Sequence, residues 1–206
     1  MSLLFKLFPC LSEINSEHLP TWTEDDFPWK ILSDGEGGIF SQIGEITESK
    51  DGVFIHSSAS IGDFVTMEGP CYVGPNAIIR HSAYLRGGSW ICDGAIVGNS
   101  SEVKNSILLP GAKAPHFNYV GDSILGFEVN LGAGTKLSNV RNDRRGVMVT
   151  VEGGFRIDSG LRKLGALIGD GSQLGCNVVT NPGSLLMPGS MIPPNDSISG
   201  WNEVKS

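Results

Sequence analysis

Aliphatic side chains recur every six residues in the part of the chain that follows residue 50. Ten consecutive positions share this spacing: Ile55, Ile61, Met67, Val73, Ile79, Leu85, Ile91, Val97, Val103 and Leu109. A small or compact side chain stands four residues after most of them, for example Ala59, Cys71 and Ala77, and glycine often follows directly, as at Gly62 and Gly74. This pattern is typical of the hexapeptide repeat of a parallel β-helix. Each repeat supplies a short strand and a turn, and three repeats close one triangular coil.

The same period predicts how the rest of the chain is organised. The register slips and resumes at Tyr119, Leu125, Leu131 and Leu137, breaks over residues 138–167, and returns at Ile168, Leu174, Thr180, Leu186 and Ile192. A break that recovers the same period indicates an inserted loop, and long excursions from a compact domain are usually functional. A helical face would need a period of 3.6 residues. We therefore predict an all-β fold: a β-helix over residues 51–198, an inserted loop at 138–167 and a tail at 199–206.

Residues 1–50 lack the repeat. Thr23 is followed by three acidic residues and then by apolar side chains, a pattern that predicts a short N-capped helix, and another helical turn is expected around residues 12–19. We expect this partly helical cap segment to pack on one end of the β-helix, where it would cover a sheet edge that could otherwise recruit other chains.

The charge is unevenly distributed along the chain. The 22 acidic and 15 basic side chains give a net charge of −7, and residues 1–50 alone hold nine acidic and three basic side chains, a net of −6. No basic stripe supports nucleic-acid binding, and no apolar run approaches the roughly 18 residues of a membrane span. The apolar start of the chain contains Lys6 and lacks a small-residue cleavage site, so we expect a cytoplasmic protein.

The predicted insert carries the opposite charge. Six of the 15 basic side chains fall within residues 138–167, namely Arg141, Arg144, Arg145, Arg156, Arg162 and Lys163, against three acidic ones. Guanidinium groups bind phosphate oxygens in a bidentate manner, so this concentration predicts an anionic, phosphate-bearing ligand. The alternative is a basic loop that is merely solvated. The four cysteines are widely spaced and form no C-x-x-C pair, so no metal is predicted.

Three ordered motifs carry a resemblance to a known family. They are E-V-K-N at 102–105, K-A-P-H-x-x-Y-x-G-D-S at 113–123 and V-N-L-G-A-G-T at 129–135. They resemble the acetyltransferase half of the bifunctional UDP-N-acetylglucosamine pyrophosphorylase/glucosamine-1-phosphate acetyltransferases. The run R-K-L-G-A-L-I-G-D-G-S-Q-L-G-C-N at 162–177 is closer to archaeal-type sugar-1-phosphate nucleotidyltransferases with an amino-sugar acetyltransferase tail. The resemblance covers roughly residues 55–195.

The resemblance implies a left-handed parallel β-helix that assembles into homotrimers with active sites between subunits, although parallel crossovers are usually right-handed. It also implies acetyl transfer from acetyl-CoA to the 2-amino group of a hexosamine 1-phosphate. The amine must lose a proton, and His116 matches the family's general base. The residues expected to bind the amino-sugar phosphate are Arg86, Lys104, Tyr119, Asn130, Asn139, Arg144 and Arg145. Those expected on the acetyl-CoA side are Ala133, with the backbone N–H groups near Gly132 and Ala133 as oxyanion donors, and Arg162, Lys163 and Cys176.

Departures from the family pattern leave a second hypothesis open. Val140 replaces a tyrosine, Arg145 falls near a functional lysine position, and Met148 stands close to where archaeal-type relatives have another lysine. The chain could therefore be a non-catalytic subunit that binds sugar phosphates or nucleotide sugars, or that trimerises a separate nucleotidyltransferase.

Two other activities are not expected. The chain has neither the Gly-rich nucleotide-binding loop nor the room for a nucleotidyltransferase domain, so pyrophosphorylase activity should be absent. The zinc carbonic anhydrases that share the fold need closely spaced histidines, whereas His56, His81 and His116 stand 25 and 35 residues apart.

Overall fold

The computed structural model describes residues 2–14, 18–23 and 27–203. Its main body is a stack of triangular coils whose three sides are three parallel sheets. Sheet 1 contains β1 (Val53–Ile55), β4 (Cys71–Val73), β7 (Ser89–Ile91), β10 (Ser106–Leu108), β13 (Ile124–Leu125), β18 (Ala166–Ile168), β21 (Ser184–Leu186) and β24 (Trp201–Asn202). Sheet 2 contains β2 (Ser60–Ile61), β5 (Ile78–Ile79), β8 (Ile96–Asn99), β11 (Lys113–His116), β14 (Asn130–Leu131), β19 (Gln173–Leu174) and β22 (Met191–Ile192). Sheet 3 contains β3 (Thr66–Met67), β6 (Tyr84–Leu85), β9 (Glu102–Lys104), β12 (Tyr119–Gly121), β15 (Lys136–Leu137), β20 (Val179–Thr180) and β23 (Ser197–Ile198).

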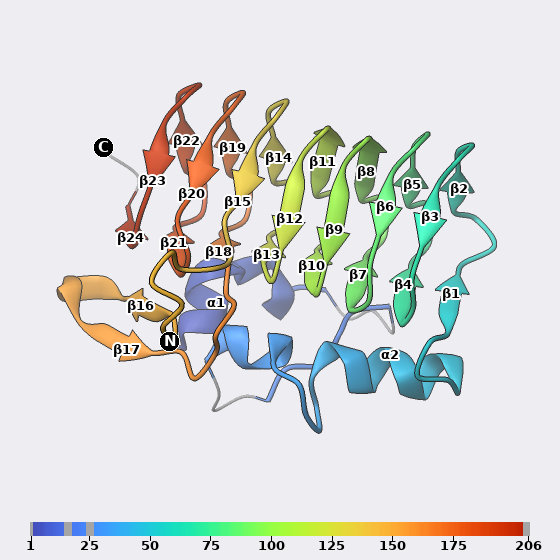
Figure 1. The fold of residues 1–206 in the computed structure, drawn as a ribbon, viewed down its shortest axis with the longest axis horizontal. Helices are drawn as coiled ribbons and strands as arrows, with labels where there is room; N and C mark the ends of the chain where they lie inside the picture. The colour runs from blue at the N-terminus through green and yellow to red at the C-terminus, as the bar shows by residue number, and fades with distance from the viewer. Residues whose placement is uncertain (1, 15–17, 24–26, 204–206) are drawn as a thin grey trace.

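The coils wind in the left-handed sense, so the predicted left-handed parallel β-helix is confirmed (Figure 1). The core inside the coils is aliphatic and follows the six-residue period, with Val73, Ile91 and Leu125 among its fully buried members. Because each strand pairs in parallel with the strand one coil away, identical positions of successive coils stack on each other. Among the described residues, no helix has the length and apolar character that crossing a bilayer requires.

The register differs from the prediction at two positions. Leu108, not Leu109, pairs with Ile91 and enters the core, and Val120 rather than Tyr119 is the inward residue of β12. One cause lies in the corner before β10, where Asn105 adopts a left-handed backbone conformation with φ of 44° and links Lys104 directly to Ser106. This corner is one residue shorter than the one in the preceding coil, so the six-residue count from Val103 reaches Leu109 instead of Leu108. The corner before β13 is equally short, because Asp122, with φ of 49°, links Gly121 directly to Ser123, so counting back from Leu125 gives Tyr119 instead of Val120.

The N-terminal segment lies along the outer face of sheet 1 and not on an end of the β-helix, so that expectation was wrong. Its helices are α1 (Leu3–Leu7), η1 (Pro9–Ser12), η2 (Pro28–Leu32) and α2 (Ile39–Thr47). A second apolar cluster joins buried side chains of this segment, such as Trp29 and Ile39, to outward residues of sheet 1, such as Trp90 and Ile124. Figure 1 shows the blue helices running beneath the row of coils.

The helices of this segment also differ from those expected. Residues 24–26 of the predicted capped helix, and residues 15–17 of the second predicted turn, lie outside the described residues. After Phe27 the chain forms the 3₁₀ helix η2. Of the described residues in the second predicted turn, 12–14 and 18–19, Ser12 alone is helical, as the last residue of η1. The sequence patterns did not predict α1 or α2.

The insert leaves and re-enters the stack at one corner. It contains an antiparallel hairpin of β16 (Met148–Thr150) and β17 (Arg156–Asp158), with the 3₁₀ turn η3 (Glu152–Gly154) between them. Its base is closed by an antiparallel bridge between Val140 and Lys163 and by a 2.9 Å hydrogen bond from the Leu164 N–H to the Asn139 carbonyl. Beneath it, β13 pairs directly with β18, so the stack continues without interruption.

Candidate functional site

The corner between sheets 2 and 3, here called the 2–3 corner, holds three of the predicted residues in successive coils. His116 is the last residue of β11, and its carbonyl accepts the Gly134 N–H at 3.0 Å. The Ala133 carbonyl in turn accepts the Asn177 N–H at 2.8 Å, which places Cys176 one coil further on. Neighbouring strands lie about 4.8 Å apart, so the predicted base and two residues predicted on the acetyl-CoA side line one edge.

Local geometry presents His116 to solvent. The Asn118 side chain accepts the His116 N–H at 2.9 Å and donates to the Gly132 carbonyl at 2.8 Å, which ties this turn to the next coil. Phe117 follows with a positive φ of 37° and is 57% exposed. A side chain at Gly134 would begin 2.8 Å from the Phe117 ring, so only glycine leaves space for that ring. The imidazole is exposed beside this turn.

One of the two predicted oxyanion donors is already used. The Gly132 N–H donates to the Leu174 carbonyl at 2.6 Å as part of the ladder between coils. Within the described part of the chain, the Ala133 N–H makes no such bond and remains the candidate donor. Asn130 lies elsewhere, on the outer face of sheet 2 between Lys113 and Gln173.

The strands of sheet 3 begin at the 2–3 corner, and their outer face carries further predicted residues. Tyr119 begins β12 and lies between Glu102 and Lys136 of the adjacent coils. Arg86 forms an ion pair with Glu102 at 2.8 Å. The Tyr119 hydroxyl accepts a 3.2 Å hydrogen bond from the Asn139 amide, and burial raises the pKa of this phenol above its ordinary value. Tyr119 therefore stays a neutral hydroxyl at physiological pH.

The corner between sheets 3 and 1, here called the 3–1 corner, is organised by a buried carboxylate that the sequence argument did not single out. Asp122 is 3% exposed and accepts the Asn105 amide at 2.8 Å and the Asn139 amide at 2.5 Å. The Lys104 ammonium lies 3.6 Å from the same carboxylate. Asn105 also donates to the Leu32 carbonyl at 3.0 Å, so this corner holds the N-terminal segment.

A signal for Asp122 and Asn105 was present in the sequence. Both stand inside the quoted motifs, at the last position of E-V-K-N and in G-D-S. Both adopt a positive φ, a conformation that Asn and Asp tolerate better than other non-glycine residues. Their roles depend on which residues meet them from adjacent coils, and no spacing in the sequence shows this.

A cleft of about 480 Å³ adjoins the 3–1 corner, and we call it the junction cleft. It is lined by Leu32, Ser33, Asp34, Phe40, Lys104, Asn105, Asp122, Leu161, Arg162 and Lys163. Arg162 and Lys163 thus lie with Lys104, at the opposite end of the sheet 3 strands from Ala133 and Cys176. The structure therefore separates two members of the predicted acetyl-CoA set from the other two.

Arg144 and Arg145 lie on the exposed outer turn of the insert. Arg141 donates two hydrogen bonds to Asp143, which also accepts the Arg145 N–H at 3.1 Å. These hydrogen bonds hold the pKa of Asp143 below its ordinary value, and those from Arg141 contribute most. A second cleft of about 480 Å³, between this turn and the last coils, is lined by residues that include Val140, Arg141, Met148 and Arg156.

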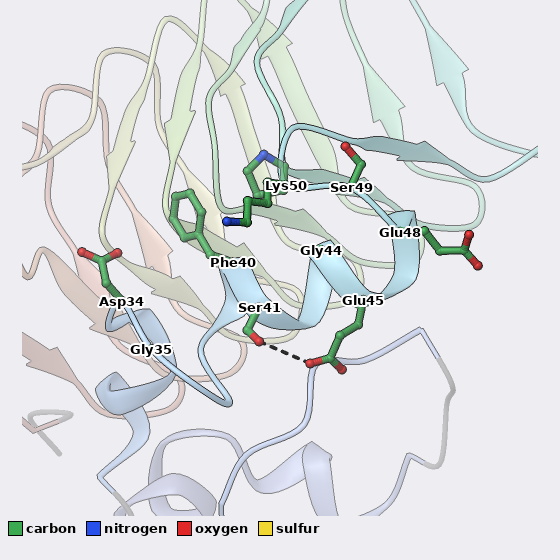
Figure 2. A pocket seen from close by; sticks show the side chains of 10 residues that line it. Asp34, Gly35, Phe40, Ser41, Gly44, Glu45, Glu48, Ser49 and Lys50 are labelled. Atoms are coloured by element: carbon green, nitrogen blue, oxygen red, sulfur yellow. Dashed lines mark hydrogen bonds between the residues drawn. The ribbon is translucent and has the colours of Figure 1, made fainter.

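A groove of about 780 Å³ runs along α2 and contains none of the predicted site residues. Three carboxylates, those of Asp34, Glu45 and Glu48, line it together with Lys50. Figure 2 shows Phe40 pointing from the start of α2 toward the strands, and the same side chain also lines the junction cleft. Across residues 2–14, 18–23 and 27–203, no group of three or more His, Cys, Asp or Glu side chains is placed to hold a metal ion.

Comparison with known proteins gives relatives that are longer than this chain. No protein-family model matches it. The chain is 37% identical over 170 residues to a bifunctional sugar-1-phosphate nucleotidylyltransferase/acetyltransferase of Sulfurisphaera tokodaii. The aligned region covers 79% of this chain and 42% of the relative. It is 36% identical over 186 residues to the bifunctional protein GlmU of Methanococcus maripaludis. This second alignment covers 84% of this chain and 44% of the relative. The chain thus spans less than half the length of these relatives.

Among solved structures, a hexapeptide transferase family protein from Anaplasma phagocytophilum is 18% identical and covers 71% of this chain and 73% of its own, with a TM-score of 0.35.

Proposed function

Because the chain is related to the acetyltransferase half of the bifunctional sugar-1-phosphate nucleotidylyltransferase/acetyltransferases, we propose that it transfers an acetyl group from acetyl-CoA to an amino-sugar phosphate such as glucosamine 1-phosphate. The observation that carries this proposal is the 2–3 corner. There an exposed His116 stands in the same column of turns as Ala133 and Cys176.

In the proposed reaction the sugar amine attacks the carbonyl carbon of the thioester. His116 accepts the proton that the amine loses and thus acts as the general base. The Ala133 N–H donates to the oxygen that becomes negative in the tetrahedral intermediate. The C–S bond then breaks, and CoA leaves as the thiolate. Tyr119 holds the sugar on the outer face of sheet 3, and the buried Asn139 orients the hydroxyl of Tyr119.

We further propose that the active assembly is a homotrimer with the site between neighbouring subunits. His116 lies at one end of the sheet 3 strands, and the cationic residues of the junction cleft lie at the other. A site that combines residues from two copies would bring a base and a phosphate anchor within reach of one small substrate. Mixed trimers of two inactive variants, one in each region, should then recover part of the activity.

The test is acetylation of glucosamine 1-phosphate measured by release of free CoA thiol. Replacing His116 with alanine should lower kcat by about 10²- to 10⁴-fold, the usual contribution of a general base. His81→Ala is the matched control, since His81 is an exposed histidine of the same corner and its backbone carbonyl, which the substitution leaves in place, accepts the Asn99 amide one coil away at 3.0 Å. Activity that survives in the His116 variant at the level of the His81 variant removes His116 from the base role.

The second candidate is a non-catalytic binding subunit, favoured by Val140, Arg145 and Met148 at positions where the family has other residues. Such a protein would bind CoA or sugar phosphate and release no thiol. Saturable binding of glucosamine 1-phosphate without turnover, with acetyl-CoA present and across several amino-sugar phosphates, would select it over the enzyme.

A further inference from the structure

The junction cleft is built by three parts of the chain that are far apart in sequence. The N-terminal segment supplies Ser33, Asp34 and Phe40, the 3–1 corner supplies Lys104, and the base of the insert supplies Arg162 and Lys163. The segment is anchored to this corner by the bond from Asn105 to the Leu32 carbonyl. The cleft exists only because these three parts meet.

Cations gather around this cleft in a chain whose net charge is −7. Arg162 and Lys163 are exposed, and neither has a carboxylate partner among the described residues. Lys104 adds a third cation from the 3–1 corner. Like charges brought together in this way repel one another, so an anion bound among them would relieve the repulsion.

The one buried carboxylate that lines the cleft offsets the charge of Lys104 and leaves Arg162 and Lys163 without a counter-charge. Asp122 already accepts the Asn105 and Asn139 amides, and its contact with Lys104, at 3.6 Å, is longer than a hydrogen bond. Asp34, on the loop before α2, is the remaining acidic residue of the lining and is exposed. The cleft is therefore cationic on its insert side and bordered by a single exposed acid on its N-terminal side.

We propose that the junction cleft binds a phosphate monoester and that the N-terminal segment forms one wall of this site. The Arg162 guanidinium presents paired donors that match two phosphate oxygens, and the ammonium groups of Lys104 and Lys163 add point charges. A volume of about 480 Å³ lies within the range of small-molecule sites. Two ligands of the proposed function carry this group: the 1-phosphate of the amino sugar and the 3′-phosphate of CoA. The choice between these ligands rests on the proposed function, whereas the phosphate site does not.

Titration calorimetry on the full chain tests the proposal with inorganic phosphate, glucosamine 1-phosphate, CoA and dephospho-CoA. The double variant R162Q/K163Q should bind at least one of inorganic phosphate, glucosamine 1-phosphate and CoA about tenfold or more weakly than the wild type. The control R80Q/K113Q removes the same charges outside the cleft, at the exposed Arg80 and at the half-buried Lys113, and should change affinity by less than about twofold. Unaltered thermal midpoints in both variants show that folding is intact.

Comparison of the four ligands shows whether the bound phosphate belongs to the amino sugar or to CoA. A loss for glucosamine 1-phosphate assigns the cleft to the sugar phosphate, and a loss for CoA but not for dephospho-CoA assigns it to the 3′-phosphate. Equal affinities of R162Q/K163Q and the wild type for every ligand overturn the proposal, even if the protein acetylates sugars. If the cleft variant loses phosphate binding while the wild type shows no acetyl transfer, the proposed function fails and the phosphate site stands.

The N-terminal wall has its own readout. Replacing Asp34 with asparagine removes the negative charge next to the bound anion and should tighten binding by about threefold at low salt. Glu45→Gln is the matched control, since Glu45 lines the neighbouring groove on α2 and not the junction cleft (Figure 2). Identical affinities of the Asp34 and Glu45 variants would show that the N-terminal segment does not border the ligand.

Discussion

Replacing Asp122 with alanine should destabilise the protein more than any exposed acidic substitution. The carboxylate is 3% exposed and holds two amides of adjacent coils at 2.8 and 2.5 Å. A hydrogen bond to a charged group contributes about 1.5–3 kcal/mol, and a buried donor left without a partner costs about 1–3 kcal/mol. Some of this loss is recovered if the freed amides bond to each other or to water. We therefore expect the free energy of unfolding to fall by about 3–5 kcal/mol.

A matched control exists in the same β-helix. Asp93 accepts the Asn76 amide at 3.1 Å, again between adjacent coils, but this pair is exposed. Asp93→Ala should therefore change the free energy of unfolding by no more than about 0.5 kcal/mol. Asp122→Asn keeps the side-chain volume and one acceptor, so its loss should fall between those of the two alanine variants.

Urea unfolding followed by tryptophan fluorescence measures these differences as shifts of the midpoint at constant slope. The four tryptophans report on both the N-terminal segment and sheet 1. A destabilisation of Asp122→Ala within about 1 kcal/mol of that of Asp93→Ala would refute the reasoning. It would mean that the buried carboxylate does not hold the 3–1 corner together.

Two further predictions concern the register and the pH dependence of stability. Val120→Ala should cost about 2–3 kcal/mol because Val120 is fully buried, whereas the outward Val179→Ala on the same sheet should cost less than about 1 kcal/mol; equal urea midpoints would contradict the register. Burial raises the pKa of Asp170, which accepts the Cys10 and Phe127 N–H groups at 3.0 and 2.9 Å. The folded state therefore keeps this proton to higher pH than the unfolded chain, and the stability of the wild type relative to Asp170→Asn should fall as pH rises from about 4 through the raised pKa. A difference between the two midpoints that stays constant over this range would exclude this linkage.

The stack of coils could be predicted from the sequence because its core repeats. Each inward aliphatic residue packs on the equivalent residue one coil away, so the pattern records the packing directly. The loss of register at Leu108 could not be seen in this way. Leu108 and Leu109 are adjacent leucines, and the shorter corner depends on the positive φ of Asn105.

The sequence contains a signal for the position of the N-terminal segment, but this signal lies in the outward residues of sheet 1 and not in the inward ones. The residues just before the inward positions of sheet 1 point outward, and several are large and apolar: Tyr72, Trp90, Ile107, Ile124, Leu167 and Leu185. The equivalent positions of sheet 3 are mostly polar, for example Glu102 and Lys136. An apolar outer face on one side of the triangle needs a cover, and the described part of the N-terminal segment provides it.

The closed base of the insert has a consequence for how such proteins diversify. Because Val140 and Lys163 meet at one corner and β13 pairs directly with β18, the segment between them can change length or composition without disturbing the ladder. Lengthening a loop whose ends already meet costs little, about 0.6 kcal/mol for each doubling. Natural selection can therefore alter the exposed turn at 142–146 and the exposed hairpin tip at 152–156, whereas Val147 and Val149 are buried in the second apolar cluster and must stay apolar.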